Sequence, residues 1–411
     1  MHHWVVDVKA PTLDLQPTMY EIQGETAFAF LALAKKLEAQ GRRIISFGIG
    51  QPDFPTPKNI REAAKKALDE GFTGYTETAG IPELREAIAE YLNRRYNAGV
   101  EPDEIVATTG AKTAIFLAIA AYLRPGEEVI VPDPSYYAYA MIAKFFGGKP
   151  VYAGMKFEPH YGFKLDIEKI ESLVTDKTRI IVVNNPHNPT GSIFDADQIA
   201  ELYDLARKKN IILLFDEIYD NFVYEEGKFK SILSFPDWRD NVVYVNGFSK
   251  TFSMTGWRLG YLVVRKEVIP KILDLAVSVY SCPPSIAQKA GIEALKGDWS
   301  EVYKMINEFK KRAEILYDIL KDAYGIEPYK PHGAFYMFPR VRELLDKAGL
   351  SVEEFSHKLL YDYGVVVLPG TSFPGSLGKD FIRLSFATST EDIKEGAKII
   401  VKASKELAGA G

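Results

Sequence analysis

Apolar runs alternate with helical periodicities along the middle of the chain. Between residues 104 and 264, short runs rich in Val, Ile and Leu are separated by longer stretches with the spacing of amphipathic helices. The predicted strands are 104–108, 128–131, 151–153, 180–184, 211–215, 242–245 and 261–264. Continuous apolar strands are typical of a parallel sheet that is covered by helices on both faces. The pattern therefore predicts an α/β fold with crossover helices between the strands.

The pattern changes after a long predicted helix at 300–323. Three strand-like runs, 333–338, 364–368 and 381–386, then alternate with two more helices, which is typical of a smaller α+β unit. A chain of 411 residues is also too long for one comfortable hydrophobic core. We therefore expect two domains.

Composition excludes several classes of protein. The net charge is −5 and no block of Lys and Arg occurs, which argues against a nucleic-acid partner. No apolar run approaches the length of a membrane span, and the first seven residues lack the pattern of a signal peptide. The single cysteine, Cys282, rules out an intramolecular disulfide and suits a reducing compartment. These features predict a cytoplasmic protein.

Lys250 is the first candidate for chemistry, because it lies in a polar loop (247–260) between two predicted strands. A lysine amine can condense with an aldehyde to form a Schiff base. Arg258, in the same loop, has a planar guanidinium suited to a phosphate. An aldehyde and a phosphate together describe pyridoxal 5'-phosphate. The alternative is that both residues are ordinary solvated loop charges.

Two other predicted strands also end in polar residues. Asp216 follows the apolar run 211–215, and a buried carboxylate there needs a cationic partner such as a protonated pyridine nitrogen. The run that ends at Asn184 leads into a turn rich in Asn, Pro and Gly (185–191). Such a turn alone is unremarkable. Ligands of open α/β sheets, however, bind beyond the carboxyl ends of the strands, so these segments predict a shared site.

Four ordered motifs, at 185–191, 216–219, 249–260 and 381–386, resemble those of the class I and II aminotransferases, the aspartate aminotransferase-like group of fold type I pyridoxal-phosphate enzymes. Their order and spacing agree over nearly the whole chain. The resemblance implies a large cofactor-binding domain (49–305) with a mostly parallel sheet flanked by helices. It also implies a smaller α+β domain, formed by 1–48 together with 306–411.

The resemblance assigns roles around the cofactor ring. Lys250 would hold the cofactor as a Schiff base and, once freed, would carry a proton. Asp216 would keep the ring nitrogen protonated, and Tyr219 and Asn188 would hydrogen-bond its phenolic oxygen. Lys250, Asp216 and Tyr219 are thus the predicted catalytic residues.

A helix that starts after the strand 104–108 offers an anion site at its N-terminus. We expect the phosphate to bind there, on Gly110, Ala111 and Lys112, with Arg258 and Ser249 added. Gly247 is a departure, since many relatives have a hydroxyl residue three positions before the lysine. Gly110 could alternatively serve a plain tight turn.

The remaining expectations concern aromatic and substrate contacts. Tyr136 matches the residue that stacks on the ring in relatives, although Tyr137 competes for the role. Tyr75 resembles the tyrosine that reaches the phosphate of the neighbouring subunit, which implies a homodimer with shared active sites. Arg383 is expected to bind the substrate carboxylate, with Gly50 as a backbone contact, unless an internal salt bridge occupies it. No metal site is predicted.

The leading hypothesis is an aminotransferase that moves an amino group between an L-amino acid and a 2-oxo acid by a ping-pong mechanism. The amino acid could be aromatic, aspartate or similar, and the expected partner is 2-oxoglutarate. Phe28 and Phe30 could cap a pocket for an aromatic side chain, although phenylalanines at this spacing are usually core. Two alternatives share these motifs: a lyase or synthase that acts on one amino acid, and a non-catalytic cofactor-binding regulator.

Overall fold

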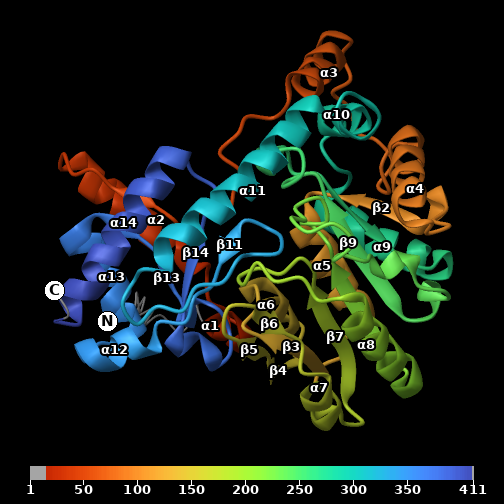
Figure 1. Cartoon of the computed structure of the whole chain (residues 1–411). Helices are drawn as coiled ribbons and strands as arrows, with labels where there is room; N and C mark the ends of the chain where they lie inside the picture. The colour runs from red at the N-terminus through yellow and green to blue at the C-terminus, as the bar shows by residue number, and fades with distance from the viewer. Residues whose placement is uncertain (1–14, 410–411) are drawn as a thin grey trace.

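A seven-stranded sheet dominates the structure, a computed structural model that describes residues 15–409 (Figure 1). The strand order is β2-β10-β9-β8-β7-β3-β4. The strands are β2 (Ile105–Thr108), β3 (Glu128–Asp133), β4 (Lys149–Gly154), β7 (Thr178–Asn184), β8 (Ile212–Asp216), β9 (Val242–Gly247) and β10 (Gly260–Val263). All seven predicted strands are therefore present, within two residues of the expected bounds in most cases.

Strand β10 is the exception to the parallel arrangement, because it pairs antiparallel with both β2 and β9. A parallel neighbour requires a crossover connection, usually a helix. The segment from 248 to 259 contains only one short 3-10 turn, so the chain returns directly beside β9. The α/β fold with a mostly parallel sheet is confirmed.

Helices cover both faces of this sheet. Along β8, Leu213 and Phe215 contribute to one hydrophobic cluster and Leu214 to another, as the alternation of side chains in a strand requires. The first cluster includes side chains of α4 (Pro82–Tyr96), α7 (Ile167–Leu173), α8 (Ala196–Lys209) and α10 (Ser285–Lys296). The second includes α5 (Ala111–Tyr122), α6 (Tyr137–Phe145) and α9 (Ile269–Tyr280). The helix α3 (Lys58–Asp69) packs against α10.

A second group of elements, drawn mainly in blue, lies beside the sheet (Figure 1). It contains α11 (Ser300–Leu320), α12 (Arg342–Ala348), α13 (Val352–Tyr363) and α14 (Thr390–Leu407). Its strands are short: β11 (Tyr336–Met337), β12 (Val365–Val366), β13 (Leu368–Pro369) and β14 (Ile382–Ser385). The predicted strand 333–338 is mostly irregular, since Ala334 adopts a left-handed conformation with φ 53°. The predicted strand 364–368 divides, because β12 pairs with β1 and β13 pairs with β14.

The N-terminal segment contributes α1 (Pro17–Glu21), α2 (Thr26–Ala39) and β1 (Ile45–Ser46). Strand β1 pairs parallel with β12, which joins this segment to the C-terminal group. A small hairpin of β5 (Lys156–Glu158) and β6 (Gly162–Lys164) completes the strands. Residues 1–14 of the predicted small domain lie outside the described residues, and the domain bounds stay a prediction. Within 15–409, no helix is both long and apolar enough to cross a membrane.

Candidate active site

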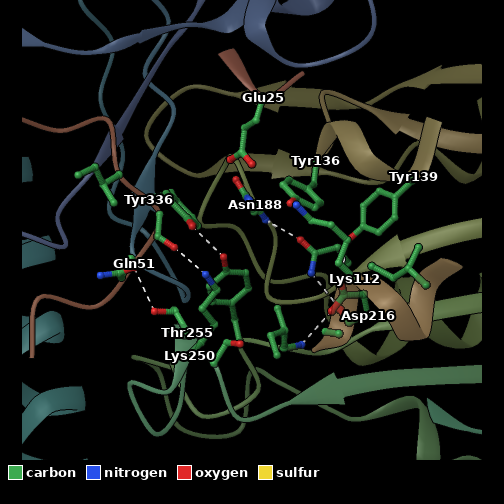
Figure 2. A pocket seen from close by; sticks show the side chains of 18 of the residues that line it. Glu25, Gln51, Lys112, Tyr136, Tyr139, Asn188, Asp216, Lys250, Thr255 and Tyr336 are labelled. Carbon is green, nitrogen blue, oxygen red and sulfur yellow. Dashed lines mark hydrogen bonds between the residues drawn. The ribbon is translucent and has the colours of Figure 1, made fainter. Parts of the chain in front are cut away.

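The carboxyl ends of three neighbouring strands bring the predicted site residues together. Asn184 at the end of β7 pairs with Asp216 at the end of β8, and Asp216 pairs with Val245 of β9. The loops that follow therefore leave the sheet side by side and enter one pocket (Figure 2). The predicted residues that line this pocket are Gly50, Ala111, Lys112, Tyr136, Asn188, Asp216, Tyr219, Ser249, Lys250, Arg258 and Arg383.

Lys250 lies in the middle of the pocket (Figure 2). Its Nζ donates a hydrogen bond to the carbonyl oxygen of Gly50 at 2.6 Å and lies 5.9 Å from the ring centroid of Tyr219. Burial lowers the pKa of Lys250 to about 8. A lysine with such a pKa can become a neutral nucleophile or base near neutral pH, which is what Schiff-base chemistry requires.

Asp216 is a buried carboxylate at the end of β8. It accepts hydrogen bonds from Tyr139 Oη at 2.7 Å and from the Ile218 amide at 3.1 Å. Among the described residues, no Lys, Arg or His nitrogen lies within 4.0 Å of it, and burial raises its pKa to about 6. Above that pH the site holds an unpaired negative charge, which a protonated pyridine nitrogen of pyridoxal phosphate would neutralise.

The start of α5 offers a cradle for a phosphate. Ala111 and Lys112 are the first two helical residues, so their amides have no partner within the helix. Gly110, the N-cap, has φ 94°, and a Cβ there would overlap the guanidinium of Arg258. Arg258 is held against this turn by donation to the carbonyl oxygens of Thr255 and Thr109 at 2.7 and 3.3 Å. The arrangement fits the phosphate of the cofactor, and the close approach of Arg258 explains why position 110 is a glycine. Gly110 itself does not line the pocket.

Arg383, on β14, is buried with an incomplete set of partners. Its Nη2 donates to the carbonyl oxygen of Gly48 at 2.8 Å and its Nη1 to Asn188 Oδ1 at 3.2 Å, while Nε has no partner in the part of the chain that is described. The guanidinium lies over the ring of Tyr336. The structure shows no ion pair to Arg383 within residues 15–409, so the internal salt bridge is not supported. The carboxylate of a substrate would supply the hydrogen-bond acceptors that this guanidinium still lacks.

Tyr139, Tyr336 and Glu25 are among the pocket residues that were not identified as site residues from the sequence. Tyr139 holds Asp216, and Tyr336 shares a hydrogen bond of 2.7 Å with Tyr219. Glu25 projects into the pocket from the N-terminal segment (Figure 2). Tyr139 could have been found, because it lies one helical turn after Tyr136 and so faces the same side. The placement of Glu25 and Tyr336 depends on contacts between distant segments, for which the sequence gives no signal.

The structure also separates candidates that the sequence left open. Tyr136 lines the pocket, whereas Tyr137 does not; Tyr137 instead accepts a hydrogen bond from Lys112 Nζ at 3.2 Å. Phe28 lines the pocket and is 66% exposed, whereas Phe30 is buried in the core. Tyr75 is 90% exposed and does not line the pocket of its own chain.

The chain is similar to known proteins in both sequence and structure. A family model described as aminotransferase class I and II matches residues 42–400. The chain is 52% identical to the aspartate aminotransferase of Sulfurisphaera tokodaii, with 94% of this chain and 97% of that protein covered. It is 38% identical to aromatic-amino-acid aminotransferase 2 of Thermococcus litoralis, over 90% and 94% of the two chains. Among solved structures, the aspartate aminotransferase of Thermotoga maritima is similar with a TM-score of 0.88 and 36% identity, over 95% of this chain and 99% of that one.

Proposed function

Because the chain belongs to the class I and II aminotransferase family, we propose that its preferred reaction is the transfer of the amino group of aspartate to 2-oxoglutarate. The family makes the protein a transaminase that uses pyridoxal 5'-phosphate and acts on amino acids and 2-oxo acids. Membership of this family favours an aminotransferase over the two alternatives that the sequence left open, a lyase or synthase and a non-catalytic regulator. The preference for aspartate goes beyond the family and rests on the charges of the pocket.

Lys112 is the observation that carries the proposal. Four cationic side chains of the described residues line the pocket: Lys112, Lys250, Arg258 and Arg383. Lys250 is proposed to bind the cofactor aldehyde, Arg258 its phosphate and Arg383 the substrate α-carboxylate. Lys112 is then left for a second carboxylate. Its Nζ lies 5.6 Å from the ring centroid of Tyr136, and we propose that the second carboxylate of the substrate binds there.

When bound, the cofactor supplies an aldehyde that accepts the amino group and a ring that withdraws electrons from the substrate Cα. Residues of the pocket would move the proton, hydrogen-bond the cofactor and position the substrate. The amine of Lys250, with its pKa lowered to about 8 by burial, would take the proton from the substrate Cα and deliver it to the cofactor carbon that carried the aldehyde. Tyr219 stays protonated, since burial raises its pKa well above the usual value, and so it can donate a hydrogen bond to the cofactor. Asn188 already contacts Arg383, so it would also help to position the substrate carboxylate.

Replacing Lys112 by Gln should lower kcat/KM for aspartate about 10- to 100-fold, because one charge-assisted contact is lost. The backbone amide at 112 is retained, so the phosphate cradle should stay intact. Steady-state rates with aspartate, alanine and phenylalanine, each with saturating 2-oxoglutarate, measure the effect. Alanine and phenylalanine should react at nearly the original rate.

The matched comparison is Arg383→Lys, which keeps the charge but loses the planar fork. Its kcat/KM should fall by about two orders of magnitude for all three amino acids alike, since each has an α-carboxylate. An equal loss for the three substrates in Lys112→Gln would show that Lys112 does not select aspartate. Full activity of Arg383→Lys with a lowered melting temperature would make Arg383 a structural residue.

A homodimer with shared active sites is proposed on the position of Tyr75. This tyrosine projects from the loop between α3 and α4 and is nearly fully exposed in the single chain. Such exposure suits a residue that hydrogen-bonds the phosphate in a neighbouring subunit. Tyr75→Phe should therefore weaken cofactor binding about ten-fold without changing the molecular mass in solution. Light scattering that gives the mass of one chain for the active enzyme would refute the shared site.

A cytosolic location is likewise a proposal, supported by the single free cysteine, Cys282.

A further inference from the structure

Glu25 brings a negative charge into the pocket from the N-terminal segment (Figure 2). It occupies the N-cap position of α2, but its side chain makes no capping hydrogen bond to that helix. The carboxylate instead points toward the space between Tyr136 and Asn188 (Figure 2). Within residues 15–409 it has no ion-pair partner closer than 4.0 Å. An acidic side chain in this position therefore faces whatever enters the pocket.

The charge of Glu25 acts on the groups in the middle of the site. Burial lowers the pKa of Lys250, and Glu25 is the largest of the charges that oppose this effect, ahead of Asp216. Glu25 also raises the pKa values of Tyr136 and Tyr336, in both cases as a smaller contribution than burial. The carboxylate thus shares the space around Tyr136 with the ammonium of Lys112.

The proposed function leaves two charges for the substrate side chain. Arg258, Lys250 and Asp216 are assigned to the cofactor, and Arg383 to the α-carboxylate. Lys112 and Glu25 remain, with opposite signs. A second carboxylate on the substrate would be attracted by Lys112 and repelled by Glu25, whereas an uncharged side chain would interact weakly with both.

We propose that Glu25 is a specificity-determining residue that limits the preference for dicarboxylate substrates and so admits amino acids with apolar side chains to the same pocket. The apolar residues beside it support this role. Phe28 and Leu31, on the first turns of α2, line the same pocket as Glu25. Ile49 and Ile115 line it as well. The inference rests on the proposed function, since it assumes that the substrate side chain lies between Lys112 and α2.

Glu25→Gln tests the proposal on the holoenzyme. We expect kcat/KM for aspartate to rise about ten-fold relative to kcat/KM for phenylalanine, because only the second carboxylate loses a repulsive neighbour. The loss of the negative charge near Lys250 affects both substrates alike and cancels in this ratio. Two amine-free inhibitors separate binding from chemistry. The inhibition constant of succinate should fall about ten-fold, and that of 3-phenylpropionate should stay the same. Glu25→Asp, which keeps the charge, should behave like the original enzyme.

Glu38→Gln is the matched control, because Glu38 is exposed on the same helix and does not line the pocket. A lower inhibition constant for succinate together with a higher kcat/KM for aspartate in this variant would attribute the effect to net charge and overturn the proposal. Equal changes in kcat/KM for aspartate and phenylalanine in Glu25→Gln, or a lower kcat/KM for aspartate relative to that for phenylalanine, would also overturn it. The proposed function is tested separately. If Lys112→Gln leaves kcat/KM for aspartate unchanged, the proposed preference for aspartate is wrong. The inhibition constant of succinate in Glu25→Gln then still decides the role of Glu25.

Discussion

Lys250→Ala is expected to lower the rate of transamination by at least about 10⁴-fold. The variant would lose the covalent attachment of the cofactor and also the group that moves the substrate proton, and general acid–base catalysis alone contributes roughly 10²- to 10⁴-fold. Burial lowers the pKa of Lys250 to about 8, so its amine is more often neutral near neutral pH than that of a solvent-exposed lysine. Single-turnover rates with excess cofactor and aspartate measure the loss.

The fold should survive this substitution, because the Lys250 side chain makes one hydrogen bond to the carbonyl oxygen of Gly50. Lys271→Ala, at an exposed position on α9, is the control and should be fully active. If Lys250→Ala kept more than a tenth of the original rate, the proton transfer would have to be assigned to another residue.

Asp216→Ala is expected to lower kcat about 10²- to 10³-fold, the usual cost of removing one electrostatic contact that the transition state needs. Without this carboxylate the ring nitrogen has no anionic partner, so the ring withdraws electrons less strongly. The cradle of Arg258 and the α5 amides is unchanged, so the variant should still bind cofactor. Stopped-flow rates at saturating cofactor check the prediction.

Glu217→Gln is a stringent control for this variant, because it alters the next buried carboxyl in the chain. Glu217 accepts hydrogen bonds from Ser231 Oγ and the Ile232 amide, and it does not line the pocket. Burial raises its pKa to about 8, so at neutral pH it is mostly protonated and Gln is close in charge and shape. Glu217→Gln should keep nearly full activity. Near-normal kcat in Asp216→Ala would contradict the role of Asp216.

The sequence was sufficient for the sheet and for the residues at its carboxyl edge. Apolar runs such as 211–215 are long and continuous, so their burial and the position of Asp216 follow directly from the pattern. Strand bounds were less certain in the C-terminal part, where β12 and β13 each contain two residues and pair with different partners. Such short strands are determined by tertiary pairing and leave little periodicity to detect.

The substrate side of the site could not be predicted in the same way. Glu25 and Phe28 reach the pocket from an N-terminal segment whose strand β1 pairs with the distant strand β12. Tyr336 reaches it through an irregular segment that begins at Ala334, a residue with positive φ. These placements depend on long-range packing, so the pocket residues at the carboxyl edge of the sheet were more predictable than those from the N-terminal and C-terminal segments.

The role of Lys250 can be tested by mapping the lysine to which the cofactor is attached. The purified enzyme would be reduced with borohydride, digested and analysed by mass spectrometry. We expect one modified lysine, Lys250, in the peptide that follows β9, and no modification in Lys250→Ala. Attachment to Lys112, or to any other lysine in the unsubstituted enzyme, would contradict this role of Lys250.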